Sequence, residues 1–232
     1  MATLTNSVAA TPAEAICSRR SVRAFLPTPV PRPTVERILD IARQAPSGSN
    51  IQPWHVQVVA GSHRDRLVQA ILAADDADAP GYEQEYRYYP EEWTEPYLRR
   101  RRQLGKALYQ LAGVPKGDLA AMKRQRALNY AFFHAPVGLF FTLDKRQGYG
   151  AWIDLGAFLQ SVMIAARGEG LHTCPQAAFS KYHRIIRQHL PIPEDDILVC
   201  GMALGLADPE APVNRLVPER AAVSEFTSFL WD

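Results

Sequence analysis

The sequence predicts a single domain in which helices and strands share one core. Apolar residues recur at helical spacing from about Thr34 to Ala45, alternate with polar residues from Trp54 to Val58, and form an uninterrupted run from Val137 to Leu143. The first pattern is typical of a helix, the second of a half-buried strand and the third of a fully buried strand. With 232 residues, 47% of them hydrophobic, and no internal repeat or low-complexity linker, the chain can build one large core.

Composition and charge favour small-molecule partners in a reducing compartment. The formal net charge of +2 gives no argument for a nucleic-acid or membrane-surface partner. The cysteines Cys17, Cys174 and Cys200 contain no CxxC pair, so we expect no disulfide framework. Residues 1–10 lack a basic stretch followed by a long apolar one, and no later apolar segment reaches membrane-spanning length without interruption. We therefore expect a cytoplasmic protein.

The N-terminal part combines a helix start with a basic cluster. Thr11-Pro12-Ala13-Glu14 supplies an N-cap residue, a proline at the first helical position and an acid at the third, which predicts a short helix. Three arginines and a serine follow: Arg19, Arg20, Ser21 and Arg23. Guanidinium groups match phosphate oxygens with forked donors, so this cluster suits a phosphate. A solvated basic turn is the alternative.

The polar stretch Pro46–Trp54 joins the periodic helix to the alternating strand, and we interpret it as the active-site loop. Pro46 ends the helix. Small hydroxyl and amide side chains, among them Ser47, Asn50 and Gln52, offer donors, acceptors and close backbone approach to a polar ligand. An ordinary turn would use the same residue types and remains the alternative.

A helix over Arg66–Ala74 leads into residues 75–135, which contain an excursion from the core. From Asp75 to about Pro96 the chain is crowded with tyrosine, tryptophan, acids and prolines and lacks a sustained period. Aromatic insertions of this kind cover a site or pack on a partner subunit. We therefore expect a lid or a dimer contact.

The run Arg99–Arg102 opens a helical pattern with apolar residues at Leu104, Leu108 and Leu111. A solvated helix face explains these arginines better than a nucleic-acid site, because the whole chain is nearly neutral. Asp118 then caps a second helix that we expect to run toward Phe133.

The helix expected over Trp152–Ala166 is the most apolar of the chain, with residues of this kind on every side. It should be buried nearly all round, and a second subunit could supply the missing neighbours. The aromatic tail Val223–Trp231 is also expected to dock.

A second polar loop is expected over His172–Phe179, followed by a helix over Ser180–His189 and a buried strand over Ile197–Leu204 that is broken at Gly201. Cys174 and the nearby histidines do not have the spacing of zinc ligands, so we expect no metal.

Four motifs taken in order resemble the FMN-dependent nitroreductase family over nearly the whole chain. They are Arg19–Arg23, Pro46–Trp54, Thr173-Cys174-Pro175-Gln176 and Asn214–Arg220, and Tyr88–Trp93 resembles the nitrobenzoate-reductase branch. The resemblance implies an α+β sandwich over residues 1–232, with a central mixed, mostly antiparallel sheet flanked by helices. It also implies an intertwined homodimer with two FMN molecules at its interface.

The resemblance also implies roles for individual residues at the phosphate end of the flavin. Arg19, Ser21 and Arg23 would hold the phosphate, ribityl chain and pyrimidine edge, with Arg20 contributing main chain. Arg220 would close on the phosphate.

At the flavin ring the resemblance implies contacts from two loops. Ser47 would reach FMN from the other subunit, and Asn50 and Gln52 would line the flavin or substrate side. Three residues would lie along the isoalloxazine edge near N5: Pro175, Gln176 and the backbone amide of Ala177. His172 departs from the small residue common before Thr-Cys-Pro-Gln in the family.

The activity that the resemblance implies is electron transfer from NADH or NADPH through FMN to a nitroaromatic, quinone or similar acceptor, by a ping-pong mechanism. We expect no side chain to be indispensable as a general acid or base, including His55, His134 and His172, because protons can come from water. Two alternatives stay open. One is reductive dehalogenation of the iodotyrosine deiodinase type, for which Glu83–Lys106 shows no clear substrate clamp. The other is a flavin-binding or flavin-consuming protein of the same fold.

Overall fold

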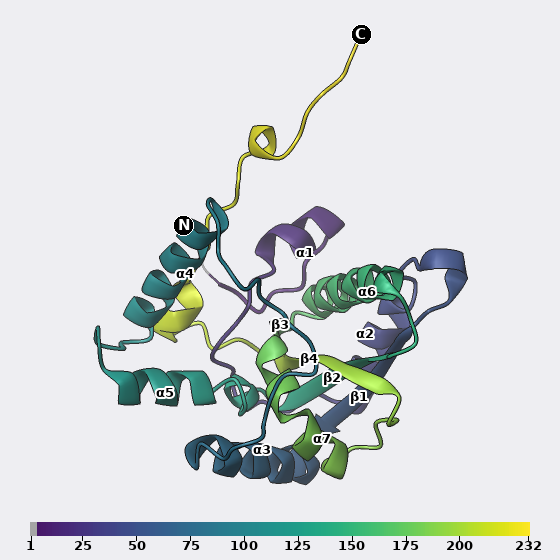
Figure 1. Cartoon of the computed structure of the whole chain (residues 1–232). Coiled ribbons are helices and arrows are strands. Elements are labelled where there is room, and N and C mark those ends of the chain that lie inside the picture. The colour runs from purple at the N-terminus through teal and green to yellow at the C-terminus, as the bar shows by residue number, and fades with distance from the viewer. Residues whose placement is uncertain (1–3) are drawn as a thin grey trace.

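A four-stranded sheet with helices on both faces organises residues 4–232, which a computed structural model describes (Figure 1). The strands are β1 (Trp54–Ala60), β2 (Val137–Asp144), β3 (His172–Gln176) and β4 (Asp196–Gly205). The helices are α1 (Pro12–Ser18), α2 (Arg32–Ala42), α3 (Gly61–Asp76), α4 (Tyr97–Leu111), α5 (Leu119–Ala127), α6 (Tyr149–Gly168) and α7 (His183–His189).

The strand order is β1-β2-β4-β3, and every neighbouring pair is antiparallel. Within the described residues the parallel pairing is an isolated bridge between Ser21 and Thr173, which gives the sheet its mixed character. The predicted α+β class with a mostly antiparallel sheet is therefore confirmed.

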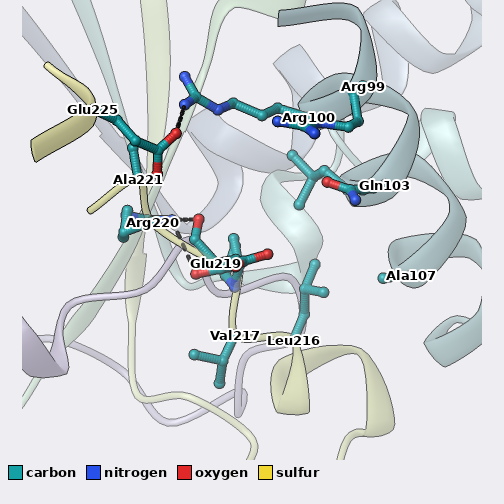
Figure 2. A pocket seen from close by; sticks show the side chains of 12 residues that line it. Arg99, Arg100, Gln103, Ala107, Leu216, Val217, Glu219, Arg220, Ala221 and Glu225 are labelled. Carbon is teal, nitrogen blue, oxygen red and sulfur yellow. Dashed lines mark hydrogen bonds and ion pairs between the residues drawn. The ribbon is translucent and has the colours of Figure 1, made fainter. Parts of the chain in front are cut away.

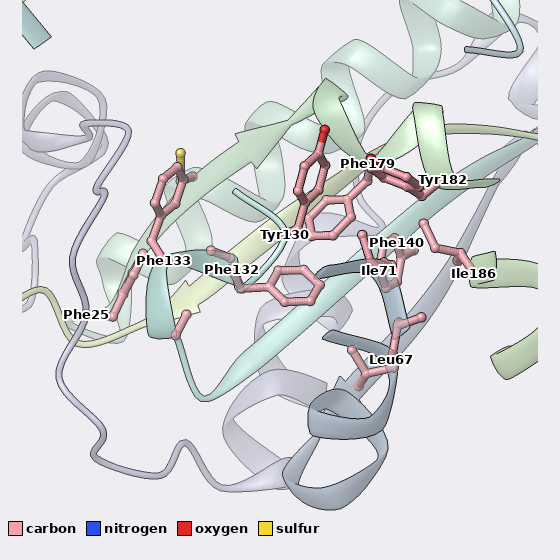
Figure 3. Packing of buried hydrophobic residues seen from close by; sticks show 14 of the residues in the cluster. Phe25, Leu67, Ile71, Tyr130, Phe132, Phe133, Phe140, Phe179, Tyr182 and Ile186 are labelled. Carbon is pink, nitrogen blue, oxygen red and sulfur yellow. The ribbon is translucent and has the colours of Figure 1, made fainter. Parts of the chain in front are cut away.

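Strand β2 contributes side chains to two separate hydrophobic cores, because its side chains alternate between the faces of the sheet. Leu139, Phe141 and Leu143 pack with α2 and α6 on one face. Phe140 packs on the other face with α3, α7 and the ring of Phe179 (Figure 3). Full burial of such a side chain stabilises the fold by roughly 1.5–3 kcal/mol. A continuous apolar run was the right signal for this strand.

Strand β4 runs through Gly201 without a break, so the break expected there is wrong. A Cβ at Gly201 would lie 2.4 Å from the Phe179 ring, which explains the glycine by close packing. The irregularity of β4 lies nearby instead, where the register against β2 shifts between Phe141 and Thr142 and leaves Val199 unpaired.

The prediction of a second polar loop is also wrong in part, because His172–Gln176 forms strand β3. Pro175 lies within this strand. An edge strand tolerates proline because a missing N–H group costs no ladder bond on the open side, and β3 is at the edge of the sheet.

The capping box of α1 forms as predicted: Glu14 N–H donates to Thr11 Oγ1 at 3.1 Å, and the Glu14 carboxylate accepts from Thr11 N–H at 3.3 Å. Asp118 caps α5, but this helix ends at Ala127, short of the expected Phe133. Residues Phe132–His134 have φ of 52°, 52° and 66°, a left-handed conformation that cannot continue a helix. Burial of the Phe132 and Phe133 rings holds this turn in place (Figure 3).

Helix α6 is buried on one side only, so the expectation of burial all round is not met within a single chain. Leu155, Phe158 and Val162 pack on the sheet, whereas Ile153 is 75% exposed. By length and hydropathy alone α6 could cross a membrane, a test that core helices of other proteins also pass. The tail from Val223 contacts α4 through the ion pair of Glu225 with Arg100, but beyond that point it extends away from the domain, and its aromatic side chains stay exposed instead of docking on their own chain (Figure 1).

Candidate functional site

Two long-range hydrogen bonds, one to a backbone carbonyl and one to a side chain, position the arginine cluster that follows α1. Val22 N–H donates to the carbonyl of Thr173 on β3 at 3.1 Å, beside the Ser21–Thr173 bridge. Arg23 N–H donates to Oδ1 of Asn214 at 2.8 Å. The cluster is therefore held between the edge of the sheet and the C-terminal segment.

This placement gathers five of the predicted site residues around one pocket of about 850 Å³: Arg19, Arg20, Ser21, Arg23 and Arg220. We call it the arginine pocket. Apolar residues complete its wall, among them Leu104 of α4 and Val217. Among the described residues that line it, none is acidic.

The charge of the arginine pocket is suited to an anion. Burial and the neighbouring Arg220 hold the pKa of the Arg19 guanidinium below its ordinary value. Arg23 donates to the carbonyl of Ser21 at 3.1 Å, and Arg220 donates to the carbonyls of Pro218 and Glu219 at 3.2 and 3.3 Å. Carbonyl partners leave the positive charge uncompensated, so a phosphate would relieve the repulsion between these groups.

Strand β3 contributes polar atoms that lack protein partners. Gln176 is 3% exposed, and its Nε2 donates to the carbonyl of Asn129 at 2.6 Å, while its Oε1 is buried without a hydrogen bond. Thr173 Oγ1 is in the same situation. Pro175 is exposed and Ala177 begins a 3₁₀ turn. Buried polar groups without partners are uncommon, and a bound ligand is one explanation.

These two observations fit FMN, which combines a phosphate with a polar ring edge. The arginine pocket offers a matched site for the phosphate. Gln176 and Thr173 offer hydrogen-bonding atoms on the strand to which the arginine cluster is attached.

The loop between α2 and β1 lies apart from this pocket, since Ser47, Asn50 and Gln52 do not line it within one chain. Ser47 Oγ accepts from the backbone N–H of Gln52 at 3.0 Å, and Gly48 N–H donates to the Asp154 carboxylate of α6 at 3.2 Å. Asn50 and Gln52 have φ of 58° and 48° and are exposed. The loop is thus ordered by its own contacts and presents polar side chains outward.

Sequence reasoning missed a second pocket, of about 500 Å³, between α4 and the C-terminal segment (Figure 2). Arg99, Arg100 and Gln103 line it from α4, and Glu219 and Glu225 line it from the other side. This pocket and the arginine pocket share some of their lining residues: Leu104, Leu216, Val217, Pro218 and Arg220. The signal was present in the sequence, because positions 99, 100, 103 and 104 fall on one face of a helix.

Burial keeps the Cys174 thiol and the His172 ring near the site uncharged at neutral pH. Burial raises the pKa of the Cys174 thiol to about 11, so it stays protonated at neutral pH. Burial lowers the pKa of His172 to about 4, which keeps it neutral. Within residues 4–232 no group of three or more metal-binding side chains comes together.

The fold and the arginine pocket together define an α+β protein with a basic pocket, suited to an anionic ligand, beside the edge of its sheet. The family model of the Nitroreductase family matches residues 16–206. The chain therefore belongs to the nitroreductase family, and the resemblance seen in its sequence motifs is confirmed.

Close relatives with known activities match along nearly the whole chain. The chain is 41% identical to a chloronitrobenzene nitroreductase of Comamonas testosteroni over 219 residues, covering 93% of this chain and 95% of the relative. It is 40% identical to a 4-nitrobenzoate reductase of Pseudomonas putida, with 93% of each chain covered.

Among solved structures, the FMN- and NADPH-dependent nitroreductase NfnB from Sphigopyxis sp. strain HMH is similar with a TM-score of 0.91 and 40% identity, covering 96% of this chain and 100% of that one. By contrast, an iodotyrosine deiodinase of Danio rerio matches over only 58 residues, 25% of this chain and 20% of its own, at 33% identity. The deiodinase alternative is therefore the weaker one.

Proposed function

We propose that this protein is an FMN-dependent oxidoreductase that takes electrons from NADPH or NADH and delivers them to nitroaromatic acceptors. The observation that carries the proposal is the arginine pocket, in which Arg19, Arg23 and Arg220 meet without an acidic partner among the described residues. Relatives named as nitrobenzene, chloronitrobenzene and nitrobenzoate reductases support the acceptor class.

The arginine residues would bind the phosphate of FMN through charge-assisted hydrogen bonds, with the Ser21 hydroxyl as a further donor. Gln176 and the Ala177 amide would lie along the ring edge, and Pro175 would pack beside them. When bound, FMN supplies the hydride chemistry at its N5 atom. No side chain is assigned as an acid or base.

A homodimer would complete this site. Ser47, Asn50 and Gln52 lie away from the arginine pocket of their own chain, so in our proposal they reach the FMN of a second copy. The apolar surface left exposed on α6 and in the C-terminal tail, including Ile153 and Trp231, supports burial against that copy. We place the protein in the cytoplasm.

The acceptor would lie beneath the segment 77–96, which links α3 to α4. Aromatic rings follow one another along it, from Tyr86 through Tyr88 and Tyr89 to Trp93, with neighbouring centroids 4.7–6.4 Å apart. Tyr86 also contacts Trp152 of α6 at 4.9 Å. These rings meet edge-to-face or tilted, and such an aromatic surface favours a flat aromatic acceptor.

Steady-state kinetics with the purified, FMN-loaded protein test this function. NADPH and 4-nitrobenzoate should give parallel lines in a double-reciprocal plot, as ping-pong turnover requires. Turnover of a halotyrosine above that of nitrobenzoate would instead support the dehalogenase alternative. Bound FMN that neither nicotinamide reduces would support a flavin-binding protein without this activity.

A further inference from the structure

We propose that Arg99 and Arg100 of α4 bind the 2′-phosphate of NADPH in the pocket of Figure 2 and so determine the choice between NADPH and NADH. The inference rests on the proposed function. It assigns the second pocket, which the FMN site leaves unused, to the adenosine end of the electron donor.

The first step is the continuity of the two pockets. Leu104, Val217 and Arg220 belong to both, so a ligand can extend from one pocket into the other. A dinucleotide whose nicotinamide lies at the flavin must place its adenosine some distance away, past the pyrophosphate. The second pocket, at about 500 Å³, provides room for a nucleoside with a phosphate.

The second step is the charge of the joined pockets. Apart from Arg20, five arginines line them, namely Arg19, Arg23, Arg99, Arg100 and Arg220, against the two carboxylates of Glu219 and Glu225. The single phosphate of FMN neutralises only part of this excess. A donor with a third phosphate group matches the remainder better than NADH does, because the 2′-phosphate adds up to two negative charges.

The third step is the placement of individual side chains on α4. Arg99 forms no ion pair with any residue from 4 to 232, while Arg100 donates to Glu225 at 3.2 Å, a contact visible in Figure 2. Gln103, one turn after Arg99, adds an amide donor on the same face. Glu219 on the opposite wall suits the ribose hydroxyl groups as an acceptor.

The neighbouring arginine provides a matched control. Arg101 lies on another face of α4, where its guanidinium stacks over the Trp93 ring with 4.9 Å to the centroid, and it does not line the pocket. A change at Arg101 removes the same charge from the same helix without touching the proposed phosphate site.

The experiment compares Arg99→Ala, Arg100→Ala and Arg101→Ala as FMN-loaded proteins. For the first two, the NADPH-to-NADH ratio of kcat/KM should fall about tenfold to a hundredfold, mainly through the KM for NADPH, as expected for one lost charge-assisted phosphate contact. Arg101→Ala should keep the wild-type ratio. Calorimetric affinity for adenosine 2′,5′-bisphosphate should fall with the same variants, and the affinity for adenosine 5′-monophosphate should change less.

The outcomes separate this inference from the proposed function. If both donors reduce the flavin but Arg99→Ala and Arg100→Ala leave the ratio and the bisphosphate affinity unchanged, the phosphate site is misassigned and the proposed function stands. An equal loss of ratio in Arg101→Ala would also overturn the assignment, because it would show a general charge effect. If no nicotinamide reduces the flavin of the wild type, the proposed function itself fails.

Discussion

The side chain of Asn214 holds the backbone of Arg23, although the two residues are 191 positions apart: Arg23 N–H donates to Asn214 Oδ1 at 2.8 Å. The amide nitrogen of Asn214 donates in turn to the carbonyls of Ala24 and Asp208, both at 2.8 Å. One buried amide therefore joins the segment that carries Arg19 and Arg23 to the segment that leads to Arg220. The arginine pocket depends on this junction.

Asn214→Ala should weaken both the fold and the FMN site. Asn214 is 4% exposed, and its removal takes the acceptor from Arg23 N–H and the Asn214 donor from the Asp208 carbonyl, at about 1–3 kcal/mol for each buried polar group left without a partner. The Ala24 carbonyl still accepts from Asp208 N–H at 3.0 Å. We expect a lower unfolding midpoint in urea and a higher dissociation constant for FMN. Asn214→Asp keeps the acceptor for Arg23 N–H but places a carboxylate oxygen against the carbonyls of Ala24 and Asp208, so it should also lower the unfolding midpoint. An unchanged midpoint in Asn214→Ala would contradict the role of this junction.

Arg220→Ala should weaken FMN binding about tenfold to a hundredfold, since one charge-assisted phosphate contact contributes about 1.5–3 kcal/mol. Excess FMN should restore much of the turnover, because the phosphate lies away from the reacting ring. The measurement is the FMN dissociation constant by fluorescence.

Arg215→Ala is the control for that variant. Arg215 is exposed and does not line the arginine pocket. Equal loss of FMN from Arg220→Ala and Arg215→Ala would show that Arg220 is not the anchor. The same conclusion would follow if Arg220→Ala kept its FMN and lost only its turnover rate.

The sequence predicted the elements that carry a clear local signal. The capping box at Thr11 and the apolar run that begins at Val137 needed no tertiary context, and both formed as expected. The arginine cluster could be recognised because its residue types suit a phosphate wherever the fold places them. Its partner Arg220 was reached through the family motif alone.

Features that depend on distant packing could not be predicted from local patterns. Pro175 and the polar residues around it look like a loop until pairing with β4 makes them an edge strand. Gly201 looks like a strand break until the Phe179 ring is placed against it. The pocket beside Arg99 requires α4 and the C-terminal segment to meet, a contact between residues more than a hundred positions apart.

Glu85 should anchor the aromatic segment 77–96 to the sheet. Its side chain is 11% exposed, accepts from Leu198 N–H of β4 at 2.9 Å and pairs with Arg187 at 3.2 Å. The next residue, Tyr86, donates to the Val199 carbonyl at 2.6 Å, beside the irregularity of β4. The segment therefore attaches where β4 has free backbone groups.

We expect Glu85→Ala to lower the free energy of unfolding by about 2–3 kcal/mol, because Leu198 N–H loses its Glu85 acceptor and Arg187 loses the carboxylate of its ion pair in a partly buried place. Within residues 4–232, Arg187 keeps only its contacts with the carbonyls of Pro193 and Asp196. Limited proteolysis should cut within 77–96 faster, and the KM for the nitroaromatic should rise while FMN affinity stays the same. Glu91→Ala removes an exposed ion pair with Arg87 and should change stability by less than about 1 kcal/mol. Similar effects of the two substitutions would argue against the anchor.

His172 should make the protein sensitive to mild acid. Its pKa is about 4 in the folded chain, below the ordinary value of 6.5, because the ring is buried at 1% exposure. Between these values the unfolded chain binds a proton that the folded chain does not. Stability should therefore fall as the pH decreases from 6.5 toward 4, by up to about 3 kcal/mol from this residue.

The check is the unfolding midpoint of wild type and His172→Gln at several pH values between 4 and 7. Because glutamine does not titrate, the variant should show a shallower loss of stability over this window, and the difference between the two proteins isolates His172 from other groups. Parallel curves would mean that His172 is not kept neutral by burial.

The most direct test of the central claim is an anaerobic titration of the FMN-loaded protein. The proposed function predicts that NADPH bleaches the yellow absorbance of the bound flavin and that one addition of 4-nitrobenzoate restores it in the absence of oxygen. A protein that cannot be loaded with FMN, or whose bound FMN neither NADPH nor NADH reduces, would contradict it.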